Sequence, residues 1–359
     1  MKINKVFNDM IFLLLSSSSI LVLLLTLNSC STVSYETVYP TLRDGKYDSE
    51  FPYKGSSDEL EGITKTVQRI TSTGFYKTYF FDQADEITIN KISNNSPEEL
   101  CKQSGLADQS ASGTATIIYH NEGRVALLTC AHVVNYPDTV ISYFYNDKGI
   151  ITTFVEALLI KDIEVIYAAG FPEGSKLEII ALDKKLDIAI IGRDYHDLKN
   201  YHFPVFNYPT GPAKDLEWGT FVYVFGYPMN YQMITKALVS SPNRDGEGSF
   251  LLDAVVNKGY SGGIVLAIRD GVPNFELVGI VQWVPQEENN IIAPSKRRDD
   301  EPYNSLIPYN GEFFVKRDSD IKYGIAKIIS TESIQNFIAN NKQALYDKGY
   351  YLDNYVKEY

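Results

Sequence analysis

The sequence has few basic residues for its length and few histidines and cysteines. Its 45 aspartates and glutamates outnumber its 33 lysines and arginines, which gives a net charge of −12. A nucleic-acid partner is not predicted, because phosphate binding needs a basic face. Four scattered histidines and three cysteines show no ligand spacing, and there is no glycine-rich phosphate loop. Neither a metal site nor any other cofactor is therefore predicted.

The N-terminus has the pattern of an export signal. Lys2 and Lys5 precede an uncharged apolar run, 11–27, which ends in the sequence Leu-Asn-Ser-Cys at Cys30. This ending resembles the lipobox of bacterial lipoproteins, which implies cleavage before Cys30, acyl chains on Cys30 and attachment to a membrane. The expected location is the bacterial cell envelope, facing the periplasm or the cell exterior. An uncleaved transmembrane anchor is the alternative, although the run is short for a span.

Residues 1–29 form the signal, and the rest of the chain divides into three parts by composition. Residues 30–107 are expected to be a tether and accessory segment, and their first part is rich in Tyr, Pro, Gly and Asp. From 108 to 342, many short β-branched and aromatic runs alternate with turn residues, which predicts an all-β sandwich or barrels. Within this part, 286–320 is a charged insertion expected to be an exposed loop, and 331–342 is expected to be a helix. Residues 343–359 are expected to be a C-terminal tail.

Three short segments carry candidate catalytic residues in the order His, Asp, Ser. His132 ends an apolar strand, Asp187 directly precedes one, and Ser261 lies between glycines in the sequence Gly-Tyr-Ser-Gly-Gly. Glycines beside a serine allow a tight turn that exposes the hydroxyl and nearby backbone N–H groups. The order is that of the chymotrypsin template and differs from those of subtilisin and the α/β-hydrolases.

These segments resemble the trypsin-like serine protease superfamily, nearest its bacterial HtrA-type branch without a PDZ domain. The matching stretches are Thr-Cys-Ala-His-Val-Val at 129–134, Asp-Ile-Ala-Ile at 187–190, Asp-Ala-Val-Val-Asn-Lys-Gly-Tyr-Ser-Gly-Gly at 253–263 and Phe-Gly-Tyr-Pro at 225–228. The resemblance covers about 108–342. It implies two six-stranded antiparallel β-barrels of the chymotrypsin type followed by a C-terminal helix.

The resemblance also implies a role for each site residue. Ser261 is the expected nucleophile, His132 the base and Asp187 its orienting partner, while the N–H groups of Gly259 and Ser261 form the oxyanion hole. Expected substrate-binding residues come from two segments, with Val255 at the base of the S1 pocket: Val255, Val256, Val281, Gln282 and Trp283. Because no carboxylate stands at the pocket base, an apolar residue is expected at P1 of the substrate.

The predicted function is a serine endopeptidase that hydrolyses extracytoplasmic proteins or peptides. The alternative is a pseudoprotease lipoprotein with a binding or scaffolding role. Tyr260 stands where trypsin has the aspartate that pairs with a new N-terminus, so activation by that route is not expected. Whether Cys101 and Cys130 form a disulfide or remain free thiols is left open by the sequence.

Overall fold

Antiparallel strands joined by short turns make up most of the chain that the structure describes. The computed structural model describes residues 43–146, 148–172, 176–196, 201–283, 286–294, 313–321 and 324–355. The predicted signal and Cys30 lie outside these residues. Residues from Lys46 onward form one unit. None of the helices in the described ranges has the length and apolar content that crossing a membrane requires.

The first barrel is a closed ring of six antiparallel strands. In ring order they are β1 (Val67–Phe80), β2 (Gln103–Asn121), β3 (Arg124–Cys130), β7 (Ile188–Asp194), β6 (Lys176–Asp183) and β5 (Ile151–Ala168). Pairing of β1 with β5 closes the ring, and β4 (Thr139–Tyr145) pairs with the outer part of β5. Strands β3 and β7 are buried along most of their length, because apolar residues fill this barrel from both.

The second barrel is also a closed ring of six antiparallel strands. In ring order they are β10 (Phe250–Ala254), β15 (Gly324–Ser330), β12 (Phe275–Trp283), β11 (Ile264–Ile268), β8 (Phe221–Gly226) and β9 (Met233–Ser241). Every residue of β8 and β11 is buried. The structure therefore confirms the predicted all-β fold of two six-stranded antiparallel barrels.

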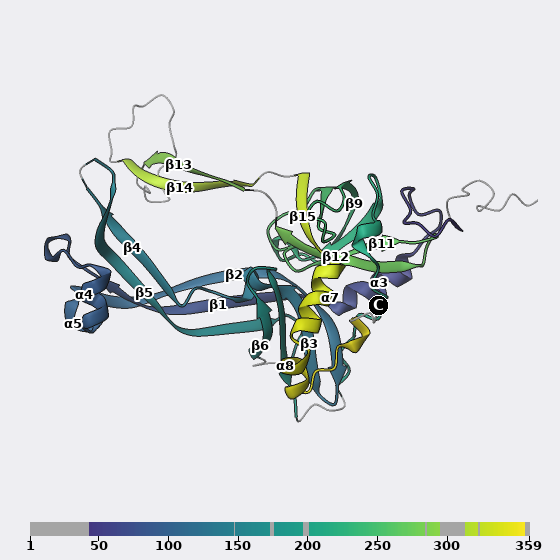
Figure 1. The fold of residues 1–359 in the computed structure, drawn as a ribbon, viewed down its shortest axis with the longest axis horizontal. Coiled ribbons are helices and arrows are strands. Elements are labelled where there is room, and N and C mark those ends of the chain that lie inside the picture. The colour runs from purple at the N-terminus through teal and green to yellow at the C-terminus, as the bar shows by residue number, and fades with distance from the viewer. Residues whose placement is uncertain are drawn as a thin grey trace, which may run out of the picture. The chain divides into compact units, whose positions relative to one another are not determined.

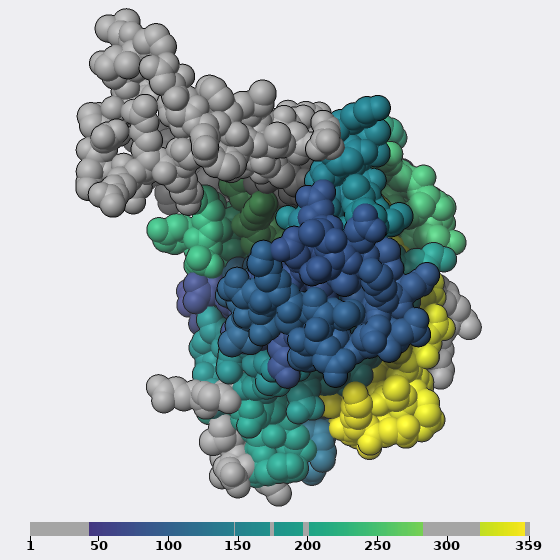
Figure 2. All heavy atoms as spheres, turned by 90° about the vertical axis from the view of Figure 1, so that its left-hand side faces the viewer, coloured from purple at the N-terminus to yellow at the C-terminus, as the bar shows by residue number. Residues whose placement is uncertain are grey.

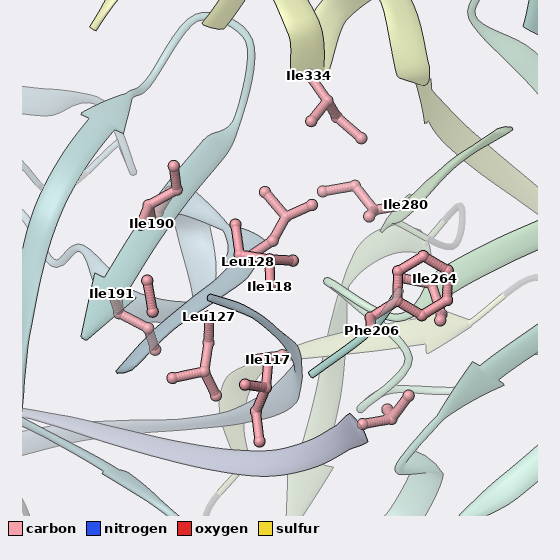
Figure 3. Packing of buried hydrophobic residues seen from close by; sticks show 14 of the residues in the cluster. Ile117, Ile118, Leu127, Leu128, Ile190, Ile191, Phe206, Ile264, Ile280 and Ile334 are labelled. Carbon is pink, nitrogen blue, oxygen red and sulfur yellow. The ribbon is translucent and has the colours of Figure 1, made fainter. Parts of the chain in front are cut away.

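A shared core joins the two barrels to the C-terminal helix. Figure 3 shows Leu128 and Ile190 of the first barrel beside Ile280 of the second and Ile334 of α7 (Thr331–Asn340), all of them fully buried. The hydroxyl of Ser330 accepts a hydrogen bond from Ser333 N at 3.2 Å and so begins the predicted helix. Beyond it, α8 (Lys342–Asp347) and a 3₁₀ turn, η5 (Asp353–Tyr355), pack on the body, and the segment expected to be a tail contributes buried Leu345, Tyr350, Leu352 and Tyr355.

Strands β1, β2 and β5 continue past the first barrel and, with β4, form an arm (Figure 1). Its tip carries η2 (Gln83–Asp85), α4 (Ile89–Asn94) and α5 (Pro97–Leu100), and Figure 2 looks onto this end of the molecule. A small cluster of its own holds the tip: Tyr79, Phe81, Ile87, Val155 and Leu158. The segment 30–107, expected to be accessory, thus supplies one strand of the barrel and much of the arm.

The helix ahead of the first barrel, α3 (Ser57–Thr66), ends where β1 starts at Val67. One local prediction differs from the structure. The insertion 286–320 is not all loop, since β13 (Gln286–Pro294) and β14 (Phe313–Ile321) pair in an antiparallel hairpin. Two further 3₁₀ turns, η3 (Ala213–Asp215) and η4 (Pro228–Asn230), flank β8.

The two cysteines in the described residues are both free thiols. Cys101 follows α5 at the arm tip, whereas Cys130 ends β3 inside the barrel and is fully buried. The open question from the sequence is therefore decided against a disulfide between them.

Candidate active site

His132 and Asp187 meet where β3 ends and β7 begins. His132 lies in α6 (Ala131–Val134), a single turn directly after β3. Its Nδ1 is 2.8 Å from Oδ2 of Asp187, and its backbone N donates to Oδ1 of Asp187 at 2.9 Å. Ala131 N also donates to the carbonyl of Asp187 at 3.1 Å. These bonds fix the ring of His132 against the carboxylate, while the side chain of His132 stays 46% exposed.

Asp187 adopts a left-handed backbone conformation, with φ of +60°. Aspartate is among the few residues other than glycine that tolerate this region. The turn before it is held by Asp183, whose Oδ1 accepts from Lys185 N and Leu186 N at 2.8 and 2.9 Å. The sequence therefore shapes the turn that aims the carboxylate at the imidazole.

A network of hydroxyl groups from the arm strand β1 fixes the loop that follows His132. The Ser72 hydroxyl donates to the carbonyl of Val133. Tyr136 returns a hydrogen bond from its OH to Ser72 O at 2.9 Å, and Tyr76 OH donates to Pro137 O at 3.0 Å. Ser72 and Tyr76 are fully buried. The base of the arm is therefore joined to this loop by buried hydrogen bonds.

Lys161 of β5 extends this network. Its Nζ donates to Tyr136 O at 2.8 Å and lies 2.9 Å from Asp138 and 3.1 Å from Glu164. The hydrogen bond from Lys161 holds the pKa of the Asp138 carboxyl below its usual range. We refer to Ser72, Tyr76, Tyr136, Asp138, Lys161 and Glu164 as the anchor network.

The turn that carries Ser261 depends on glycines that are packed closely against neighbouring backbone atoms. Gly259 and Gly262 have φ of +106° and +84°. A Cβ at Gly259 would lie 2.3 Å from Tyr227 O, and one at Gly262 would lie 2.1 Å from Thr114 O. Only glycine fits at either position, because both the backbone conformation and the space exclude a side chain.

Thr114 of β2 holds the same turn from the first barrel. Its N donates to Ser261 O at 2.8 Å, and its hydroxyl donates to Gly259 O at 2.6 Å. That hydroxyl also accepts from Tyr227 N at 2.9 Å. Thr114 is fully buried, so one side chain joins both ends of the serine turn to β2.

The N–H groups of Gly259 and Ser261 remain available in this arrangement. Neither donates to a backbone carbonyl of the described residues. The peptide before Gly259 is held by Met229, whose N donates to Lys258 O at 3.3 Å. Two unpaired donors beside a serine hydroxyl are what an oxyanion hole requires.

Tyr260 anchors the turn to the core of the second barrel, a role that was not predicted from the sequence. Its ring is 1% exposed within the second-barrel core, and its OH shares a hydrogen bond with Thr235. A Cβ at Gly226 would lie 2.5 Å from this ring, so Gly226 makes the space for it. Burial raises the pKa of Tyr260, because it disfavours the phenolate. Two sequence features together could have indicated this role: Tyr260, an aromatic residue where trypsin has an aspartate, and Gly226.

The two sides of the site meet at the end of β3. A Cβ at Gly262 would lie 3.1 Å from Cys130 N, and one at Gly113 would lie 2.7 Å from Val133 and 3.1 Å from Ser261 O. The structure thus brings the segments of all three predicted catalytic residues together. No hydrogen bond joins His132 and Ser261 in the part of the chain described.

The expected substrate-binding residues differ in exposure. Val255 is 73% exposed and Val256 is fully buried. A side chain as exposed as Val255 can touch a substrate but cannot form the floor of a closed pocket. The N–H of Val281 donates to Gly263 O at 2.8 Å and is therefore not free to pair with a substrate.

Gln282 and Trp283 lie at an irregularity of β12. The register with β15 shifts between Val281 and Trp283, which leaves Gln282 as the bulged residue. Its Oε1 is buried and has no hydrogen-bond partner among the described residues. Bulges next to active sites commonly re-aim a side chain or end a pairing.

Comparison with known proteins agrees with this geometry. Residues 113–280 match the family model described as a trypsin-like peptidase domain. The matched residues contain His132, Asp187 and Ser261. No curated protein matches the sequence.

Two solved structures are similar over much of their length. Rv3671c from M. tuberculosis H37Rv, in an inactive form, shows 13% identity and a TM-score of 0.40, covering 83% of this chain and 97% of that one. Deg5 shows 14% identity and a TM-score of 0.34, covering 64% of this chain and 87% of that one. Similarity this low transfers neither activity nor mechanism.

Proposed function

We propose that this protein is a serine endopeptidase in which Ser261 is the nucleophile, His132 the general base and Asp187 the residue that orients it. The observation that carries the proposal is the meeting of the His132–Asp187 pair and the Ser261 turn at the end of β3. A serine hydroxyl is a weak nucleophile at neutral pH and needs a base within reach. Imidazole accepts a proton in this range, and Asp187 on Nδ1 leaves Nε2 for Ser261.

The available N–H groups of Gly259 and Ser261 support an oxyanion hole. As Ser261 attacks the scissile carbonyl, negative charge develops on the carbonyl oxygen, and two donors stabilise it. Each such donor is worth about 3–4 kcal/mol in the transition state. His132 then returns the proton to the leaving amine, and water repeats the sequence on the acyl enzyme.

The substrate class follows from the chemistry of the site and its surroundings. Proteins or peptides with an apolar P1 residue are the proposed substrates, because Val255 offers an apolar contact and no charge. The bulge at Gln282 and Trp283 is the proposed place where an extended substrate pairs as an added strand. The export signal and Cys30 support a lipid anchor and a substrate outside the cytoplasm.

The test is hydrolysis of unfolded casein by the form that starts at Ser31, beside its Ser261→Ala variant. We expect cleavage by the first and none by the second. Equal cleavage by both would trace the activity to a contaminant or to another nucleophile. Absence of cleavage by both folded proteins would rule out a broad endopeptidase.

One observation favours a second candidate, a binding protein with an inactive site. His132 and Ser261 are not hydrogen-bonded in the described structure, although such bonds often tighten only when substrate is present. A serine-directed fluorophosphonate probe separates the two functions. Labelling that disappears in Ser261→Ala indicates an enzyme, and absence of labelling on folded protein indicates the binder.

A further inference from the structure

Three potential metal ligands converge beside the catalytic pair, although the sequence shows no ligand spacing. They are the thiol of Cys130, a ring nitrogen of His132 and a carboxylate oxygen of Asp187, and these atoms all lie within 4.8 Å of one another. Cys130 and His132 are close in sequence, but Asp187 comes from the turn before β7. The cluster exists only because β3 and β7 are neighbours in the first barrel.

The three groups occupy a boundary between core and solvent. Cys130 is fully buried and donates a hydrogen bond from Sγ to Val281 O at 3.2 Å. The side chain of Asp187 is 15% exposed and that of His132 is 46% exposed, so the cluster opens to solvent on the imidazole side. A cation can therefore reach the carboxylate and the ring, with the thiol behind them.

We propose that Cys130, His132 and Asp187 bind a zinc-like divalent cation, and that this binding switches the active site off. Cysteine sulfur, imidazole and carboxylate are the ligands that zinc takes in proteins, and three protein ligands plus one water complete its tetrahedral shell. The switching part of the inference rests on the proposed peptidase function. The binding part does not.

Binding changes the protons of the site in a defined way. Zinc forms bonds to Sγ, Nδ1 and one Oδ, and the Cys130 thiol releases its proton to solvent. The ring of His132 loses the proton on Nδ1 and takes one on Nε2. Thiolate, carboxylate and a doubly charged cation sum to zero, which suits a partly buried position. With a proton already on Nε2, His132 cannot accept the proton of Ser261, and attack stops.

The three ligand atoms, which lie within 4.8 Å of one another, must rearrange to form the site. The separation of 2.8 Å between Nδ1 and Oδ2 must widen to roughly 3.3 Å, since each lies about 2 Å from a tetrahedral zinc. The exposed ring of His132 can make that shift toward solvent. When the thiol turns away from Val281 O, that carbonyl keeps the hydrogen bond from Gly262 N at 2.8 Å.

Burial, and then the negative charge of Asp187, raise the pKa of the Cys130 thiol well above its usual range. A cysteine that serves only as a small core residue explains the burial equally well, but it predicts no response to metals. The two interpretations differ in a measurable way.

The experiment uses the full chain with Cys30→Ser, which removes the third thiol. Cadmium is added to the folded protein, and the ultraviolet absorption of a cadmium–thiolate bond is followed beside fluorophosphonate labelling of Ser261. We expect the band to saturate at one cadmium per chain while labelling is lost. Zinc should compete with cadmium for the same site.

Two cysteine variants make the test specific. Cys130→Ser should abolish the band and raise the cadmium concentration for half-maximal loss of labelling at least about tenfold, with the labelling of each protein compared with its own metal-free value. Cys101→Ser, at the arm tip, should behave like the parent. If Cys130→Ser does not fold, judged by circular dichroism, Cys130→Ala takes its place.

The outcomes separate the two hypotheses. No band in the parent, or a band that survives loss of Cys130, overturns the metal site. A band that depends on Cys130 while labelling continues unchanged overturns the switch. If the metal-free parent is not labelled at all, the peptidase function fails, yet the band still decides whether the site binds a metal.

Discussion

The two sides of the active site are held by different kinds of contact. On the histidine side, hydrogen bonds made by side chains predominate. The Asp187 carboxylate contacts the backbone N and the ring Nδ1 of His132, and Lys161 of the anchor network donates to Tyr136 O. On the serine side, glycines let backbone segments approach within distances that no Cβ would permit. Thr114 is the polar side chain that ties this second side to the first barrel.

This difference separates two kinds of sensitivity to mutation. A side-chain network loses one interaction at a time, so conservative substitutions on the histidine side should alter catalysis and leave the fold intact. Close backbone packing cannot be weakened gradually, because even the smallest added side chain, a methyl group, collides with a carbonyl oxygen. Substitutions on the serine side should therefore affect stability and activity together.

The largest effect on catalysis alone is expected from Asp187→Asn. Asparagine tolerates the positive φ of this position, so the backbone is retained while the charge that stabilises the imidazolium is lost. We expect kcat to fall about 10⁴-fold at neutral pH, with the melting temperature nearly unchanged. Asp183→Asn is the matched control, since its Oδ1 can still accept from Lys185 N and Leu186 N. A kcat within tenfold of the parent would remove Asp187 from the proposed triad.

Gly262→Ala should be the most destabilising substitution. Its Cβ would lie 2.1 Å from Thr114 O and 2.5 Å from Thr129 Oγ1, and φ is +84°. We expect a loss of about 3–5 kcal/mol in the free energy of unfolding, measured by urea denaturation, together with loss of labelling at Ser261.

Gly246→Ala is the control for backbone conformation alone. Its φ is +75°, but no atom lies within 4 Å of the added Cβ. We expect a cost of only about 1–2 kcal/mol and unchanged labelling. Similar losses at the two glycines would show that close packing at Gly262 is not what shapes the serine turn.

Lys161→Met tests the anchor network and should have a moderate effect. It leaves Tyr136 O and the largely buried Glu164 without their charged partner. We expect a loss of about 1–3 kcal/mol in the free energy of unfolding and a several-fold decrease in kcat with KM retained. Lys102→Met breaks an ion pair that is exposed on both sides, so it should change neither quantity measurably. Equal effects of the two substitutions would mean that the network does not position His132.

The smallest effect is a dependence of the arm tip on acid. Hydrogen bonds from Ser96 and Tyr79 lower the pKa of Glu98 from 4.5 to about 2. Because the folded-state pKa is the lower one, the stabilisation is complete above about pH 4.5 and is lost as the pH falls toward 2. Hydrogen-exchange protection of the Phe80 and Phe81 amides should fall across this window in the parent, and not in Glu98→Gln. Parallel profiles in the two proteins would contradict the assignment.

The sequence predicted the barrels better than the arm. The strands that carry or flank the three motifs are short, apolar and bounded by turns, so their positions in β3, β7, β8 and β11 were readable from the pattern. The position of the arm was not readable from the pattern. Its strand β1 buries Ser72, Gly74 and Thr78, and these residue types do not indicate a core position. Their burial depends on Tyr136 and other residues far away in sequence.

Within the candidate site, residue types were predictable and their supports were not. His132, Asp187 and Ser261 follow from short motifs with restricted chemistry. Thr114, Tyr260 and Lys161 have common roles elsewhere in proteins, and only the tertiary contacts reveal theirs. The likeness of Cys130, His132 and Asp187 to a ligand set was hidden in the same way, because the third member is brought in by the pairing of β3 with β7.

Thr114 also bears on when the proposed active site forms during synthesis of the chain. The hydrogen bond from its hydroxyl to Gly259 O joins residues 145 positions apart in the chain. A nascent polypeptide therefore emerges with β2 and His132 long before the segment that completes the turn. Cleavage by the proposed nucleophile would have to await the closing of the second barrel on the first, which would protect the growing chain from its own active site.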